Sequence, residues 1–143
     1  MKPSPEPGRQ CASAVLMIRP ARFGANPETA ASNRFQQGGT SQDAPLAARR
    51  EFEGLVLQLS NAGVAVHVAD DSPQPVKPDA CFPNNWVSFH EDGSVVLYPL
   101  MAASRRAERR EQPVALLQSA GFRISRTIDL TDWEGRGGPI AAC

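Results

Sequence analysis

Two short apolar runs on either side of a helix-patterned stretch constrain the fold of this chain more than any other feature. Residues 14–19 (AVLMIR) are too few for a helix and predict a buried strand. Over residues 46–61 the apolar side chains recur with helical spacing, and Gly63 supplies a stop signal. Residues 64–68 (VAVHV) predict a second strand. The order strand, helix, strand indicates an α/β layer architecture.

A hairpin is predicted after a proline-rich connector at residues 70–78. Residues 86–90 and 94–98 are β-rich runs on either side of Asp92 and Gly93. Asp-Gly in that position is a strong hairpin signal.

A helix and a further strand are predicted after the hairpin. Residues 105–120 predict a helix whose helical character lies in its second half. Pro113 breaks this helix early, and Gly121 ends it. Residues 122–130 resume as a strand. The chain therefore contains two successive α/β units of similar size, which indicates a repeated architecture.

Composition narrows the class of protein. With 143 residues and 41% hydrophobic side chains the chain can bury one modest core, so we expect one domain after a floppy tail at residues 1–13. Fifteen basic and fifteen acidic residues give a formal net charge of zero, which offers no field for nucleic acid or a membrane surface. The three cysteines are far apart and fit neither a zinc site nor a disulfide framework, so we expect a cytoplasmic protein without a metal or an organic cofactor. No apolar run approaches the roughly twenty residues that cross a bilayer.

The densest polar pattern lies at residues 77–90 (KPDACFPNNWVSFH). Asp79 offers a carboxylate, while Asn84 and Asn85 offer amides that both donate and accept hydrogen bonds. Loops at strand ends often carry sites, so these three side chains could hold a planar guanidinium or urea group. The alternative is that Asn84 and Asn85 only form a turn and that Asp79 is a solvated loop residue.

A second polar pattern follows the hairpin at residues 104–110 (SRRAERR). An arginine fork at Arg105 and Arg106 could clamp a carboxylate in two-point geometry. The alternative is a solvated helix face with local ion pairs around Glu108 and Glu111.

The order of these patterns resembles dimethylarginine dimethylaminohydrolase. The chain is more similar to the citrulline-utilisation hydrolases, the arginine-deiminase-related branch of the amidinotransferase, or pentein, superfamily. Several blocks in order are more specific than one short motif. The blocks span about residues 15–133 and comprise residues 19–20 (RP), 23–24 (FG), 26–33 (NPETAASN), 82–90 (FPNNWVSFH) and 96–99 (VLYP).

The resemblance implies a pentein α/β propeller of five blades around a central polar site, and about two of the five blades are expected here, at residues 14–133. It implies that Asp79 binds guanidino or ureido nitrogens, that Asn84 and Asn85 line the same pocket, and that Arg105 meets the carboxylate of an arginine- or citrulline-like amino acid. In the dimethylarginine enzymes the two asparagine positions are acidic. Because amides carry no negative charge, we expect a preference for a less cationic group, such as a ureido group.

Catalysis in this family depends on a cysteine nucleophile, with a histidine and acidic residues that move protons. Cys11 sits in the tail, Cys143 is terminal, and Cys81 takes a strand-leading position instead of the nucleophile's. His67 and His90 lie within or beside predicted strands, which favours structural roles. We therefore expect no catalytic residue in this chain, and no hydrolase or amidinotransferase activity from it alone.

The end of the chain departs from the family pattern. A glycine-rich acidic motif is expected there, but residues 136–143 read RGGPIAAC, so we expect a divergent or frameshifted end at residues 134–143. Three interpretations stay open: the N-terminal, substrate-recognising part of such an enzyme, a non-catalytic binding or assembly module, and an unrelated nucleotide binder. The lack of a glycine-rich phosphate loop counts against the third. Uncovered strand edges and apolar faces would favour self-association.

Overall fold

The structure is a computed structural model that describes residues 12–30, 43–109 and 111–135. Most of the predicted tail at residues 1–13 and of the predicted divergent end at residues 134–143 lies outside these ranges. Within them the chain is a mixed α/β protein with two small open sheets, which confirms the α/β prediction. The number of propeller blades stays a prediction.

The first unit is a parallel strand pair joined by a long helix. Strand β1 (Ala14–Arg19) pairs with β2 (Ala65–Asp70), and helix α2 (Ala44–Asn61) makes the crossover that parallel strands require. The short helix α1 (Pro27–Ala30) follows β1. Both predicted strands and the predicted helix are confirmed, with the helix beginning two residues earlier and the second strand shifted toward the C-terminus.

The second unit is a hairpin, a helix and a returning strand. Strands β3 (Val87–Phe89) and β4 (Ser94–Leu97) are antiparallel, and β5 (Arg126–Asp129) pairs with β4 in parallel after helix α3 (Glu111–Ser119). The hairpin prediction is confirmed. The core of this unit consists of Trp86, Val87, Val95 and Leu100, with Leu97 and Ile124 packed against them.

The helix predicted at residues 105–120 is in fact two elements. The first is the 3-10 helix η2 (Ala103–Glu108), and the second is α3. The Ser104–Arg106 stretch therefore lies in η2 and not in α3. Pro113 does not break α3, because it lies in the first turn, where the missing N–H has no helical partner to lose. The strand predicted at residues 122–130 is shorter, because the ladder with β4 runs only from Arg126 to Asp129.

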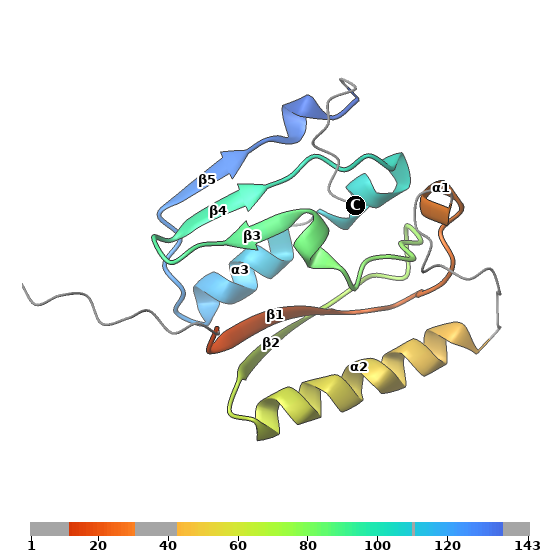
Figure 1. Ribbon diagram of the computed structural model, residues 1–143, viewed down its shortest axis with the longest axis horizontal. Helices are drawn as coiled ribbons and strands as arrows, with labels where there is room; N and C mark the ends of the chain where they lie inside the picture. Colours follow the sequence, from red (N-terminus) through yellow and green to blue (C-terminus); the bar gives the residue numbers. More distant parts are fainter. Residues whose placement is uncertain (1–11, 31–42, 110, 136–143) are drawn as a thin grey trace, which may run out of the picture.

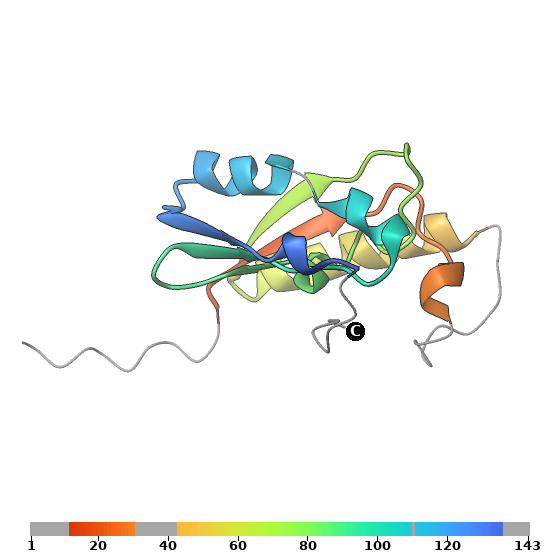
Figure 2. The same ribbon diagram turned by 90° about the horizontal axis from the view of Figure 1, so that it is seen from above.

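The two sheets lie side by side, and the helices cover different parts of them. Figure 1 shows α2 alongside the β1–β2 pair, on the side away from β3, β4 and β5. Figure 2 shows α3 on one face of the β3–β4–β5 sheet, and both α2 and α3 contact β2. Within the described ranges, no helix has the length and apolar character that a membrane crossing needs.

Three segments far apart in the sequence gather at one end of the molecule in both views (Figures 1 and 2). They are α1, the turns that follow β2, and η2. Hydrogen bonds join them, since the Ser104 backbone N–H donates to Glu28 over 2.9 Å and the Asn26 side chain donates to Asp79 over 2.8 Å. Asp79 and η2, which carries Arg105, therefore meet at this end.

The turn between β3 and β4 requires glycine at position 93. Gly93 has a φ of +79°, and a Cβ there would lie 2.8 Å from the Arg123 carbonyl oxygen and 3.1 Å from Ser125 Oγ. The Ser125 hydroxyl also donates to the Asp92 carbonyl over 2.9 Å, so the turn is packed directly against the chain that leads into β5.

Replacing Gly93 by alanine should lower the free energy of unfolding by about 2 to 4 kcal/mol, because it combines a left-handed backbone with overpacking against backbone atoms. Gly121 has a φ of +91° but nothing within 4 Å of a Cβ, so Gly121→Ala should cost only about 1 kcal/mol. Gly24→Ala, in open space, is the neutral control. Urea unfolding of the three variants is the measurement, and equal losses at positions 93 and 121 would contradict the close approach.

Candidate functional site

Asp79 is held in a tight turn and is buried. The Ala80 N–H donates to the Lys77 carbonyl over 3.2 Å, and the Phe82 N–H donates to the Asp79 carbonyl over 3.0 Å. Only 6% of Asp79 is exposed. The interpretation of Asp79 as a solvated loop residue is therefore wrong.

Asn26 is the first partner of the Asp79 carboxylate. It precedes α1 and caps it, because its carbonyl and side-chain oxygens accept backbone N–H groups of the first turn. Its side-chain amide donates to Asp79 Oδ2 over 2.8 Å, and Asn26 is 2% exposed. The same residue thus starts a helix and orients the carboxylate.

Arg105 is the second partner, and it is itself held by Glu108. The Arg105 Nε and Nη2 groups each donate to one Glu108 carboxylate oxygen over 2.9 Å, in a two-point pair. Arg105 Nε also lies 3.8 Å from Asp79 Oδ2. We call Asn26, Asp79, Arg105 and Glu108 the acid–arginine cluster, and it unites two of the four predicted site residues, Asp79 and Arg105.

The acid–arginine cluster carries one excess negative charge, from two carboxylates and one guanidinium. Burial raises the pKa of the Glu108 carboxyl, the hydrogen bond and charge of Arg105 oppose the rise, and the negative charges of Asp79 and Asp71 add to it. An added proton or cation would relieve this imbalance.

Asn84 and Asn85 form the 3-10 turn η1 (Pro83–Asn85) and follow Asp79 through two linked turns. The Asn84 side-chain amide donates to the Asn85 side-chain oxygen over 3.2 Å. The turn interpretation of this pair is confirmed as local structure. Asn84 is exposed, and Asn85 is half-buried.

Arg106 contacts different residues from those that Arg105 contacts. Its Nε donates to the Leu100 carbonyl over 3.2 Å and lies 3.1 Å from Glu134 Oε2. Glu134 also pairs with Arg109 and accepts the Leu100 N–H over 3.0 Å. Burial opposes ionisation of Glu134, but the Arg109 hydrogen bond, the Leu100 N–H and the two arginine charges together lower its pKa. Arg106 thus ties η2 to the residues after η3 (Thr131–Trp133).

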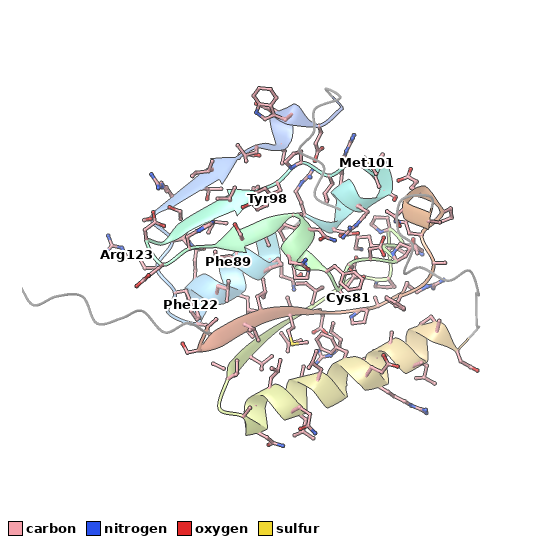
Figure 3. The ribbon with its side chains drawn as sticks, viewed as in Figure 1. Cys81, Phe89, Tyr98, Met101, Phe122 and Arg123 are labelled. Carbon is pink, nitrogen blue, oxygen red and sulfur yellow. The ribbon has the colours of Figure 1, made fainter. Side chains whose placement is uncertain are left out.

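A cavity of about 710 Å³ lies between α2, β1 and β3, a volume typical of small-ligand sites. Its wall is largely apolar and includes Asn84 and Cys81, whereas Asp79 and Arg105 do not line it. Figure 3 shows Cys81 between helix α2 and the β3–β4–β5 sheet. Burial, with smaller contributions from Asp79 and Glu108, raises the pKa of the Cys81 thiol to about 11. The thiol is therefore protonated at neutral pH and is not an activated nucleophile.

Each of the two histidines contacts a neighbouring side chain. The His67 ring meets the Phe122 ring edge-on, with 5.2 Å between the centroids, and His90 Nε2 lies 2.9 Å from Ser88 Oγ. These contacts agree with structural roles. The residues that the structure describes contain no group of three or more His, Cys, Asp or Glu side chains that could hold a metal ion.

Sequence reasoning missed Asn26 and Glu108 as site residues. Asn26 carried a readable signal, because an asparagine directly before Pro27 is a helix-start pattern and lies in one of the blocks of resemblance. The sequence pattern indicates Glu108 only as a partner in a solvated ion pair. The ion pair exists, but it is buried, and burial of a charged residue depends on tertiary contacts that local sequence does not carry.

Fold and site together describe a mixed α/β protein with a buried cluster of acidic and arginine side chains. Residues 19–140 match the family model described as "N,N dimethylarginine dimethylhydrolase, eukaryotic". Because the match covers most of the 143 residues, the chain belongs to this family, a hydrolase family of the pentein superfamily. Searches of curated proteins and of solved structures gave no match.

The raised pKa of Glu108 predicts how stability depends on pH. A carboxyl whose pKa is higher in the folded state contributes most below its unfolded pKa, and that contribution is lost as the pH rises through the folded pKa. The free energy of unfolding of the wild type, relative to Glu108→Gln, should therefore fall as the pH rises from about 4 to above the raised pKa. Urea unfolding of both proteins across this range is the measurement. A difference that grows with pH would mean that Arg105 outweighs burial.

The protonated Cys81 thiol predicts slow alkylation. In a Cys11→Ser/Cys143→Ser background, the reaction rate with iodoacetamide should still rise about tenfold per pH unit up to pH 9.5, because the pKa is about 11. Circular dichroism at each pH confirms that the protein is folded. A rate that levels off near the ordinary cysteine pKa of about 8.5 would contradict the burial of this thiol.

Proposed function

We propose that the acid–arginine cluster and η1 form the substrate-recognising part of a hydrolase or amidinotransferase that acts on guanidino or ureido amino acids. Asp79 binds the guanidino or ureido nitrogens, Asn84 and Asn85 line the pocket, and Arg105 meets the α-carboxylate. The family match supports this proposal, since the family is named for dimethylarginine.

The observation that carries the proposal is the convergence of Asp79 and Arg105. The two residues come from different turns, yet their charged groups lie 3.8 Å apart in a buried cluster. A zwitterionic amino acid with a cationic side chain offers the complementary charges to both. Charged side chains that are buried together at the end of several segments are candidates for ligand recognition.

Binding in this arrangement replaces one ion pair with two. The guanidino and carboxylate ends of an extended arginine are separated by its aliphatic chain. The charged groups of Asp79 and Arg105 must therefore move apart for each to contact one end of the ligand. Glu108 keeps Arg105 paired while Asp79 turns to the ligand, because its carboxylate accepts hydrogen bonds from both the Nε and the Nη2 group of the guanidinium. The loss of the weak 3.8 Å contact therefore leaves no charge unpaired.

The side-chain group that the site prefers depends on two opposing features. The amides of Asn84 and Asn85 favour a neutral ureido group, which is the expectation from sequence. The excess negative charge of the acid–arginine cluster favours a guanidinium instead. We propose a guanidino amino acid, such as a methylarginine, as the first ligand to test and citrulline as its competitor.

A second proposal is binding without turnover, as a binding or assembly module. The specific observation in its favour is the raised pKa of Cys81, which leaves the one cysteine of the described residues without thiolate character. Citrulline formation from dimethylarginine by the same protein would contradict this second proposal.

Asp79→Asn should weaken binding of asymmetric dimethylarginine about 10- to 100-fold, because a buried charge-assisted hydrogen bond contributes about 1.5 to 3 kcal/mol. Citrulline should lose less, since an amide can still hydrogen-bond a neutral ureido group. Isothermal titration calorimetry on the full chain measures both affinities.

The matched control is Asp132→Asn, which changes an exposed aspartate of η3 and should leave both affinities unchanged. If Asp79→Asn binds dimethylarginine as well as the wild type does, Asp79 is not the guanidino ligand and the proposed function is wrong.

A further inference from the structure

Lys77 is a fully buried lysine that has no role in the proposed chemistry, and only 1% of it is exposed. Its ammonium donates to the Ser72 carbonyl over 3.0 Å, to Ser72 Oγ over 3.1 Å and to the Pro75 carbonyl over 2.9 Å. The same nitrogen lies 2.9 Å from Asp71 Oδ1. An ammonium has three protons, so these four acceptors use its full donor capacity.

Asp71 connects this lysine to the first sheet. The Asp71 backbone N–H donates to the Arg19 carbonyl over 3.0 Å, at the end of β1. The Asp71 side chain is 2% exposed, and its Oδ2 atom has no hydrogen-bond partner among the described residues. Lys77 is therefore the counter-charge that makes burial of this carboxylate tolerable.

The backbone of Lys77 is connected to Asp79. The Lys77 carbonyl accepts the Ala80 N–H over 3.2 Å, which closes the turn that contains Asp79. One residue thus makes two connections: its side chain binds the loop after β2, and its backbone holds the turn that presents the carboxylate to Asn26 and Arg105.

We infer that Lys77 is a positioning residue for the ligand site: its ammonium ties the turn that contains Asp79 to segment 71–75, which the Asp71 N–H joins to the end of β1, and that anchor sets where the Asp79 carboxylate lies. The inference rests on the proposed function, because the ligand is the one proposed for Asp79. Its consequence is that loss of the ammonium displaces Asp79 without changing any group that contacts the ligand.

The test uses substitutions that separate positioning from folding. Lys77→Met alone leaves Asp71 buried without a counter-charge and can fail to fold, so Asp71→Asn/Lys77→Met, which removes both charges, is the principal variant. It should unfold cooperatively, yet bind dimethylarginine at least about tenfold more weakly than the wild type. Asp71→Asn alone is the matched control and should bind more tightly than the double variant, because Lys77 keeps its three other acceptors.

Hydrogen exchange supplies a readout that needs no ligand. The Ala80 amide should exchange at least about tenfold faster in the double variant, because its acceptor is the Lys77 carbonyl. The Ala62 amide, which donates to Gln58 at the end of α2, should be unchanged. Wild-type binding by the double variant, or unchanged Ala80 exchange in it, would overturn the inference.

The proposed function and the inference about Lys77 fail in different ways. If the wild type binds no dimethylarginine, the proposed function fails, and Ala80 exchange still decides whether Lys77 fixes the turn. If Asp79→Asn loses binding but the double variant binds like the wild type, the inference about Lys77 fails and the proposed function stands.

Discussion

The site depends on charged side chains that are buried only because they are paired. Lys77 neutralises Asp71, and Arg105 is shared between Glu108 and Asp79. Each pair joins segments that are distant along the chain or holds one turn against the next. Removing a single partner would leave a buried charge, which costs far more than the pair contributes. The arrangement of the turns after β2 and of η2 is therefore fixed by charge balance more than by apolar packing, whereas the sheets depend on the apolar core.

The architecture was readable because its signals are local. Residues 14–19 and 64–68 are strand-length apolar runs, and the helical spacing between them leaves a crossover as the natural connection. The hairpin was readable from Asp92 and Gly93, since the turn needs a positive φ at position 93, which glycine adopts without strain. Pro113 was misread because proline disrupts a helix only beyond the first turn, and the start of α3 was not visible in the sequence.

The site was less readable, because pairing is decided in three dimensions. Asp79 and Arg105 were identified from their place among blocks of resemblance, and the structure brings them together. Glu108 and Lys77 are charged residues in polar stretches, a pattern that is typical of solvated surfaces. Only the fold shows that Glu108 holds the Arg105 guanidinium and that the buried Lys77 ammonium contacts four acceptors in the loop after β2.

Pairing inside the acid–arginine cluster also restricts how an amino acid can bind. Glu108 occupies the Nε and Nη2 edge of Arg105, so a carboxylate ligand gains a two-point contact along that edge only by displacing Glu108. Displacement leaves Glu108 buried without its partner, a state in which its raised pKa favours uptake of a proton. A guanidino group meets the opposite situation, because it brings positive charge to a cluster with one excess negative charge. The electrostatic drive for binding therefore lies at the guanidino end of the ligand, and the carboxylate end is selected by geometry.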